Sequence, residues 1–245
     1  MSRINNRPHP LPHGVVLHLT FPPGKPVDKS ENNTPFEYID TDPDPASRQS
    51  FSNTGFGKSY LKLYKAIDQT TDDGDDVCVK LSSTPEVLSF TKNTDTSVAS
   101  SAGDDDPFTV SFWLNLAYAE TSVSTQEIVA WKTAQPESNA KWFLINYNNT
   151  HGQMTFRIDG NSPNVDTIQQ ELADYDTYYK AEWTHIVMTY NANADKSGIK
   201  VFINGEPAST TGDHSGTYVA HWSPVGSSLG VMGQSLAAPE WGVNG

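Results

Sequence analysis

The fold is decided by one stretch of the chain, Phe108-Thr109-Val110-Ser111-Phe112-Trp113-Leu114-Asn115-Leu116. Apolar side chains occupy every second position of this stretch, and the positions between them are mostly polar. Successive side chains of a β-strand point to opposite faces, so the alternation indicates a strand with one buried face and one face toward water. The stretch therefore predicts a sheet that covers a hydrophobic core with one of its faces.

Similar signals, apolar runs bounded by polar turn residues, predict strands on both sides of this stretch. These strands are expected at residues 15–21, 60–64, 77–81, 87–90, 128–132, 142–147, 154–158, 183–190 and 199–204. Only residues 167–176 have the pattern of a helix. So many short strands with so little helix favour two antiparallel sheets packed face to face, and we predict an all-β jelly-roll sandwich.

The length of 245 residues fits one large sandwich domain. Three prolines, Pro8, Pro10 and Pro12, block helix and remove strand donors, so residues 1–13 are predicted to form an extended arm before a sandwich over residues 14–245. Residues 22–57 are rich in Pro, Asp, Asn and Ser, and we expect them to form a long irregular excursion on the surface.

The charge of the chain excludes several kinds of partner. Its 29 acidic and 16 basic side chains give a net charge of -13, which opposes attraction to nucleic-acid phosphates and to anionic lipid. The sequence has neither a run of about 18 apolar residues nor a secretory signal peptide, so no membrane insertion is expected. Cys78 is the single cysteine, which excludes an intrachain disulfide and a thiolate zinc cluster.

Three segments resemble the laminin-G-like and pentraxin branch of the concanavalin A-like lectin/glucanase sandwiches. They are FTVSFW at 108–113, WTHIVMTY at 183–190 and GIKVFING at 198–205, in the order and spacing of that branch. The pair Asn204-Gly205 is the most specific part, because it suits the positive backbone angles of a tight hairpin turn. The resemblance implies a concanavalin A-like sandwich.

The same resemblance implies one further strand after residues 240–245, where the sequence ends. A sheet edge left without that strand would need to be covered or to pair with another chain. The expected partners are therefore other protein subunits of an assembly, contacted through the arm and the sheet edge.

The sequence gives little support for an enzyme. Glycoside hydrolases that share this sandwich carry Glu-x-Asp-x-x-Glu on one strand, so that two carboxylates face the substrate from one side. That spacing does not occur, and the nearest acidic stretch, residues 171–176, is better explained as a solvated face. No His-Glu-x-x-His or Gly-x-Ser-x-Gly motif is present. His185 is interpreted as a packing and hydrogen-bonding residue of its strand.

Calcium is the one cofactor that the resemblance suggests, because laminin-G-like and pentraxin proteins often hold it in loops at one rim. Two acidic clusters offer the hard oxygen ligands that this ion prefers. Their members are Asp72, Asp73, Asp75, Asp76, Asp104, Asp105 and Asp106. The alternative is that these are solvated loop carboxylates that disfavour aggregation, and the sequence leaves both interpretations open.

A glycan site requires an aromatic ring for the apolar face of a sugar, beside amide or carboxylate groups for its hydroxyls. The candidate rings in or near predicted loops belong to Trp222, Trp241, Tyr178, Tyr179 and Tyr218. Each of them has core or rim packing as its alternative role. Trp113, Trp142 and Trp183 fall inside predicted strands and are interpreted as scaffold.

Two functions follow as hypotheses. The first is a non-enzymatic structural or adhesive module of a larger assembly, such as the shell decoration or tail fibre of a virus or phage particle. This would reconcile a fold usually found outside cells with the missing signal peptide and disulfides, and it places the protein in a virion or the extracellular space. The second is a calcium-assisted lectin domain that binds cell-surface glycan. A polysaccharide-cleaving enzyme is the third alternative, against which the missing paired carboxylates argue.

Overall fold

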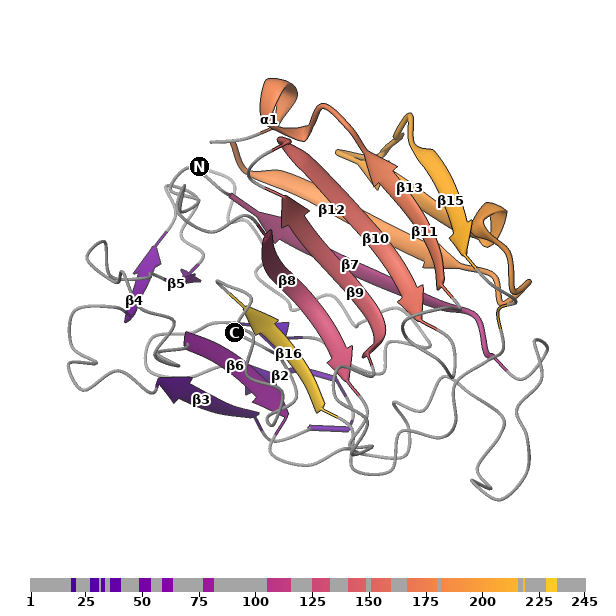
Figure 1. Ribbon diagram of the computed structural model, residues 1–245. Coiled ribbons are helices and arrows are strands. Elements are labelled where there is room, and N and C mark those ends of the chain that lie inside the picture. Colours follow the sequence, from indigo (N-terminus) through magenta and orange to yellow (C-terminus); the bar gives the residue numbers. More distant parts are fainter. Residues whose placement is uncertain are drawn as a thin grey trace, which may run out of the picture.

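Two antiparallel sheets packed face to face make up most of the described structure (Figure 1). The computed structural model describes residues 19–20, 27–30, 32–33, 36–40, 49–53, 59–63, 77–81, 105–115, 125–132, 141–148, 151–159, 167–179, 182–215, 218 and 228–232. The described part is nearly all strand, which confirms the predicted all-β sandwich. No described helix is long and apolar enough to cross a membrane.

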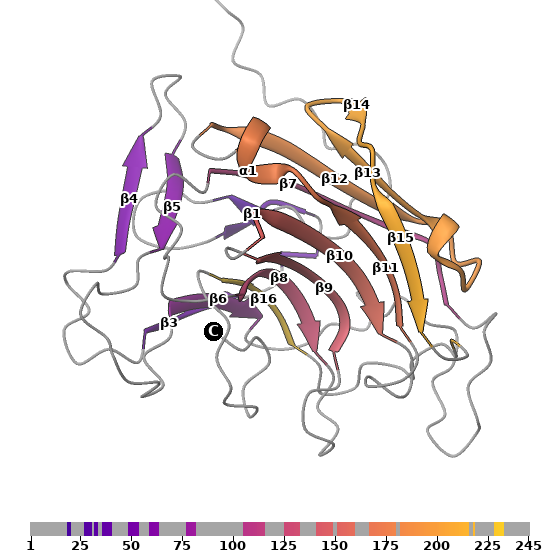
Figure 2. The same cartoon turned by 45° about the horizontal axis from the view of Figure 1, so that its top comes forward.

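The larger sheet has eight described strands. In spatial order they are β15 (Thr211–Ser215), β11 (Thr167–Leu172), β10 (Gln153–Asp159), β9 (Lys141–Asn148), β8 (Thr125–Lys132), β16 (Ser228–Met232), β6 (Val77–Leu81) and β3 (Phe36–Asp40). The smaller sheet has four, in the order β14 (Glu206–Pro207), β13 (Ile199–Ile203), β12 (Thr184–Tyr190) and β7 (Phe108–Leu114). Figure 2 shows the small sheet lying behind β10 and β11 of the large one.

Short elements complete the described chain. They are the pairs β1 (Leu19–Thr20) with β2 (Val27–Asp28) and β4 (Gln49–Asn53) with β5 (Ser59–Leu63), the helix α1 (Tyr175–Tyr178) and the 3-10 turn η3 (Lys196–Gly198). The strands β2, β3 and β4 fall in residues 22–57, so that segment is less irregular than the sequence predicts. The arm predicted over residues 1–13 and the strand predicted over 87–90 lie outside the described residues.

The core lies between the two sheets, at the positions that the alternation assigns to the inner faces. Strand β12 buries every second residue from Thr184 to Tyr190, and β10 does the same over Met154, Phe156 and Ile158. Burying one such apolar side chain stabilises the fold by about 1.5–3 kcal/mol relative to leaving it exposed. The period-two pattern of the sequence is therefore the pattern that holds the sandwich together.

The helix predicted over residues 167–176 is wrong. Residues Thr167–Leu172 form strand β11, which pairs with β10 on one side and β15 on the other. One of its buried positions is occupied by the polar residue Gln170, so the sequence of β11 does not alternate regularly between apolar and polar side chains. The Gln170 amide is hydrogen-bonded inside the fold: Nε2 donates to the Lys196 carbonyl at 2.7 Å, and Oε1 accepts from the Thr210 hydroxyl at 2.8 Å.

Candidate functional site

The outer face of the small sheet carries the two exposed large hydrophobic side chains of the described structure. Trp113 is 62% exposed and Trp183 is 41% exposed. On β7 the outer positions are Thr109, Ser111 and Trp113, and all three are exposed. These two tryptophans are exposed and are therefore not part of the core, so this face is a candidate binding surface.

The imidazole of His185 holds the Trp113 indole in place. His185 lies directly opposite Trp113 across the β7–β12 pairing, and the two rings stack with centroids 5.0 Å apart and planes 24° apart. Ser111, on the same face, also contacts the imidazole: its Oγ lies 2.8 Å from His185 Nε2, within hydrogen-bond distance. The tautomer of His185 decides which of these two atoms donates. Each ring orientation is thereby fixed before any ligand arrives.

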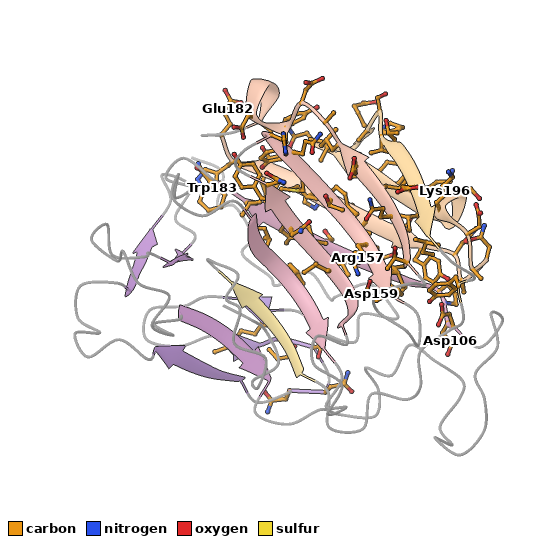
Figure 3. The ribbon with its side chains drawn as sticks, in the orientation of Figure 1. Asp106, Arg157, Asp159, Glu182, Trp183 and Lys196 are labelled. Carbon is orange, nitrogen blue, oxygen red and sulfur yellow. The ribbon has the colours of Figure 1, made fainter. Side chains whose placement is uncertain are left out.

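Trp183 belongs to the same face as His185, because it stands two residues earlier in an extended segment. It directly precedes β12, and Figure 3 shows it at the end of the small sheet where β7 ends and β12 begins. Trp183 is therefore a diagonal neighbour of Trp113, on the next strand and two residues along.

A tight turn brings an amide beside His185. Asn204 and Gly205 have φ angles of 53° and 90°, as their sequence predicts for the turn between β13 and β14. Asn204 N donates to the His185 carbonyl at 2.8 Å, and Asn204 Oδ1 accepts from His185 N at 2.9 Å. We call the surface formed by Trp113, Trp183, His185, Ser111 and Asn204 the tryptophan face. It combines flat aromatic rings with hydroxyl and amide groups, which is the chemistry that sugar recognition requires.

The outer face of the large sheet is polar and different in kind. Arg157 Nε donates to Asp159 Oδ1, and Gln169 Nε2 donates to Glu171 Oε1 at 3.2 Å. Figure 3 shows Arg157 and Asp159 at the end of β10. These polar groups bond to one another, as Ser111 and His185 do on the small sheet, but the described residues of this face include no exposed large hydrophobic side chain. The tryptophan face offers the larger apolar contact.

Tyr218, a predicted glycan-stacking residue, is buried at one rim of the sandwich. It is 3% exposed, so its ring offers no open face to a sugar. Its hydroxyl donates to Asp105 Oδ2, which also accepts from the Tyr190 hydroxyl at 2.9 Å. Burial, with the Asp105 charge as the next cause, raises the pKa of both tyrosines. The backbone N of Ala194 donates to the Tyr190 hydroxyl at 3.2 Å, which ties the following loop to this cluster.

The predicted calcium ligands are only partly within the described structure. Asp72, Asp73, Asp75, Asp76 and Asp104 lie outside the described residues. Asp105 is fully buried beneath the rim, whereas Asp106 is half-buried at the start of β7, at the opposite end of the small sheet from Trp183 (Figure 3). Among the residues described, no three His, Cys, Asp or Glu side chains gather where they could hold a metal ion.

The remaining predicted glycan residues do not meet at one place in the described structure. Trp222 and Trp241 lie outside it, and for Tyr178 only the backbone, in α1, is described. Tyr179 is half-buried and packs against the core, with its ring 5.6 Å from that of buried Tyr175. Burial raises the pKa of the Tyr175 phenol. Tyr175, the first residue of α1, and Tyr179, directly after its end, therefore serve packing.

Trp113 and Trp183, interpreted from the sequence as scaffold, are exposed in the structure, and the alternation of β7 already indicates this for Trp113. In the stretch 108–116 the inward positions are even-numbered, which leaves Trp113 on the outer face with Thr109 and Ser111. The stacking of Trp113 on His185 depends on the pairing of two strands more than seventy residues apart, which no local pattern shows. The side chain of Trp142 lies outside the described residues.

The likeness to one solved structure agrees with this architecture. The crystal structure of an HCR/D mutant aligns with a TM-score of 0.52 and 14% identity, over 90% of this chain and 43% of that one. This chain thus spans less than half the length of that structure, and the likeness is one of fold. The Ruminococcus gnavus IT-sialidase CBM40 bound to alpha2,6 sialyllactose aligns with a TM-score of 0.32 and 12% identity, over 59% of this chain and 85% of that one. No curated protein matches the sequence.

A family model gives the clearest relationship. The model Laminin_G_3, described as concanavalin A-like lectin/glucanases superfamily, matches residues 90–237. The match covers more than half of the chain and includes both strands that carry the tryptophan face. The chain belongs to this laminin-G-like family of the concanavalin A-like lectin/glucanases superfamily.

Proposed function

We propose that this protein is a non-catalytic glycan-binding module whose ligand stacks on the tryptophan face. One observation carries the proposal: the Trp113 ring is 62% exposed and is nevertheless held in one orientation by the His185 stack. A ring that is fixed before binding loses little conformational entropy when a ligand packs against it. Membership of a lectin-like superfamily supports the same function.

The polar neighbours of Trp113 fit the second requirement of a sugar. A pyranose presents C–H groups on one face and hydroxyls around its edge, so it needs an aromatic surface ringed by donors and acceptors. Ser111, His185 and Asn204 place hydroxyl, imidazole and amide groups on or beside this face. Because the rings are exposed and the edge groups polar, water is displaced from the indole while the sugar hydroxyls keep partners.

The test is a glycan array probed with the wild-type chain, with Trp113→Ala and with a control, Thr211→Ala, whose exposed side chain lies on β15 of the other sheet. Removing an aromatic anchor from an interface typically costs about 2 kcal/mol or more, so Trp113→Ala is expected to weaken each specific hit at least about thirtyfold. The control should bind like the wild-type chain. Absence of hits for the wild-type chain, or hits that survive Trp113→Ala, would overturn the proposal.

The same array decides whether calcium takes part. The tryptophan face as described contains no carboxylate cluster, so its hits are expected to survive a chelator. Loss of every hit on chelation would point instead to the acidic clusters at residues 72–76 and 104–106. Reducing-sugar release from a polysaccharide panel is expected to stay at background, and measurable release would contradict a purely binding role.

We also propose that the module acts as an adhesive component of a larger assembly, such as a virus or phage particle outside the cell. The support comes from the sequence, in the extended arm predicted from the prolines of residues 1–13 and in the single cysteine. Size-exclusion chromatography with light scattering tests this part. A chain that stays monomeric at high concentration and binds no particle protein would count against it without affecting glycan binding.

A further inference from the structure

We infer that the ligand of the tryptophan face is an uncharged glycan chain of at least two sugar units, bound across Trp113 and Trp183. This inference rests on the proposed glycan-binding function and names the class of glycan. It depends on two observations: the placement of the second tryptophan and the charge around the face.

The placement of Trp183 argues for a chain and against a single sugar. Trp183 stands diagonally to Trp113 on neighbouring strands, and such diagonal positions lie roughly 7–8 Å apart. This separation exceeds the length of one pyranose ring, so a monosaccharide stacked on Trp113 leaves Trp183 uncovered. A second sugar unit of the same glycan chain reaches Trp183.

The imidazole of His185 is the third ring of the tryptophan face. His185 is opposite Trp113 across the strand pair and stands two residues after Trp183 along its own strand, so it lies at the corner between the two tryptophans. Trp183 is 41% exposed, which leaves indole surface for that second contact.

The charge around the face argues against anionic glycans. Lys200 is exposed on the outer face, but it pairs with Thr189, four residues from His185 along β12. Four residues of strand correspond to about 13 Å. The other described cations near the small sheet are engaged elsewhere: Lys196 Nζ donates to the Gly212 carbonyl at 3.2 Å. Glu182, next to Trp183 in the sequence, is exposed.

The net charge of -13 also disfavours anionic glycans. It repels sulfated, sialylated or uronate-rich chains at long range, and it also disfavours a second copy of this chain as the occupant of the face. An uncharged glycan meets no such repulsion. The observations therefore favour a neutral oligosaccharide over a polyanion and over self-association.

The experiment titrates the wild-type chain, Trp113→Ala, Trp183→Ala and a control, Thr109→Ala, with the mono-, di-, tri- and tetrasaccharide of the best neutral array hit. Thr109 is exposed on the same face and the same strand as Trp113, but at the far end. For the wild-type chain the affinity should rise at least about tenfold from one unit to three, by analogy with the energy of one aromatic contact. Trp183→Ala should lose this rise and keep the monosaccharide affinity, Trp113→Ala should lose both, and the control should lose neither.

The possible outcomes distinguish failure of the chain-length inference from failure of the proposed function. If the monosaccharide binds the wild-type chain as tightly as the tetrasaccharide, or if Trp183→Ala keeps the full rise, the chain-length inference fails while glycan binding stands. If no saccharide binds, both fail. Should Trp183→Ala not fold, Trp183→Phe takes its place and is expected to lose part of the rise.

The charge is tested with sulfated and sialylated analogues of the same chain. They are expected to bind at least about tenfold more weakly than the neutral chain at low salt, with the gap closing as salt screens the repulsion. Tighter binding of an anionic analogue overturns the inference that the ligand is uncharged. A dimer of the wild-type chain that Trp113→Ala converts to a monomer would show that the occupant is a second copy.

Discussion

Gln170 is a glutamine buried at an inward position of strand β11. A glutamine at an inward position of a strand costs free energy unless its amide is hydrogen-bonded. Here the Lys196 carbonyl and the Thr210 hydroxyl supply the two partners. These partners come from segments more than twenty-five residues away, so the burial of Gln170 could not be predicted from its own neighbourhood.

Replacing Gln170 by Ala is expected to lower the free energy of unfolding by about 1–3 kcal/mol, because the Lys196 carbonyl and Thr210 hydroxyl lose their partner in a partly buried site. Urea denaturation followed by circular dichroism measures the change. Gln169→Ala, the same substitution one position away on the outer face, is the matched control and should cost clearly less. Equal losses for the two variants would contradict the buried role of Gln170.

Trp113 and Tyr218 show how far the surroundings of a single side chain can be predicted from the sequence. The alternation of β7 predicts that Trp113 points outward. The scaffold interpretation instead assumed that a tryptophan within a strand packs in the core. Tyr218 is the opposite case. The sequence predicts a loop residue open to a ligand, but Tyr218 is buried and its hydroxyl donates to Asp105, 113 positions earlier. A contact of that sequence separation has no local signature.

At the scale of elements, strands with regular alternation were predictable and polar ones were not. Strand β6 was predicted with the bounds that the structure gives, and β7, β10, β12 and β13 within one or two residues. Strand β11 was mistaken for a helix because Gln and Glu favour helices and because a glutamine stands at an inward position. The strands β2, β3 and β4 lie among Pro, Asp and Asn residues that signal turns.

The loop between β12 and β13 is built from asparagine side chains that hold the backbone. Asn191 Oδ1 accepts from Asn193 N at 3.2 Å, and Asn193 Oδ1 accepts from Asp195 N at 3.1 Å. Both oxygens point at Gly198, where a Cβ would lie 2.0 Å from Asn193 Oδ1 and 2.4 Å from Asn191 Oδ1. The loop therefore has room for glycine alone at this position.

Gly198→Ala is expected to destabilise the fold by about 1–3 kcal/mol, because the new methyl group displaces short side chains that are already hydrogen-bonded. A double-mutant cycle with Asn193→Ala measures the clash directly, since removing the nearer side chain relieves part of it. The double variant should lose less stability than the two single losses combined. Strict additivity would show that the methyl group is accommodated elsewhere.

At the scale of the whole molecule, buried tyrosines make the fold sensitive to alkali. Burial raises the pKa of Tyr175, Tyr190 and Tyr218 above the ordinary value near 10. In the unfolded chain these phenols ionise at about pH 10, so above that pH the unfolded state binds fewer protons than the folded state. Stability contributed by these groups is complete below about pH 10 and is lost as the pH rises.

We therefore expect the free energy of unfolding to fall by about 1.4 kcal/mol per pH unit above pH 10 for each tyrosine that stays protonated in the fold. Urea denaturation at a series of pH values measures this slope. Tyrosinate absorbance gives a second reading: the buried phenols among the ten tyrosines should ionise only when circular dichroism reports unfolding. Ionisation of all ten near pH 10 with the sheets intact would contradict the burial.

The position of β16 has a consequence for how this protein is made. In the larger sheet β16 lies between β8 and β6, pairing with both through residues 228–232. During translation these two strands leave the ribosome long before their shared neighbour does. From the time that β8 is made until residues 228–232 follow, the nascent chain thus carries an open gap in its sheet, and the final closure waits for one short, late segment.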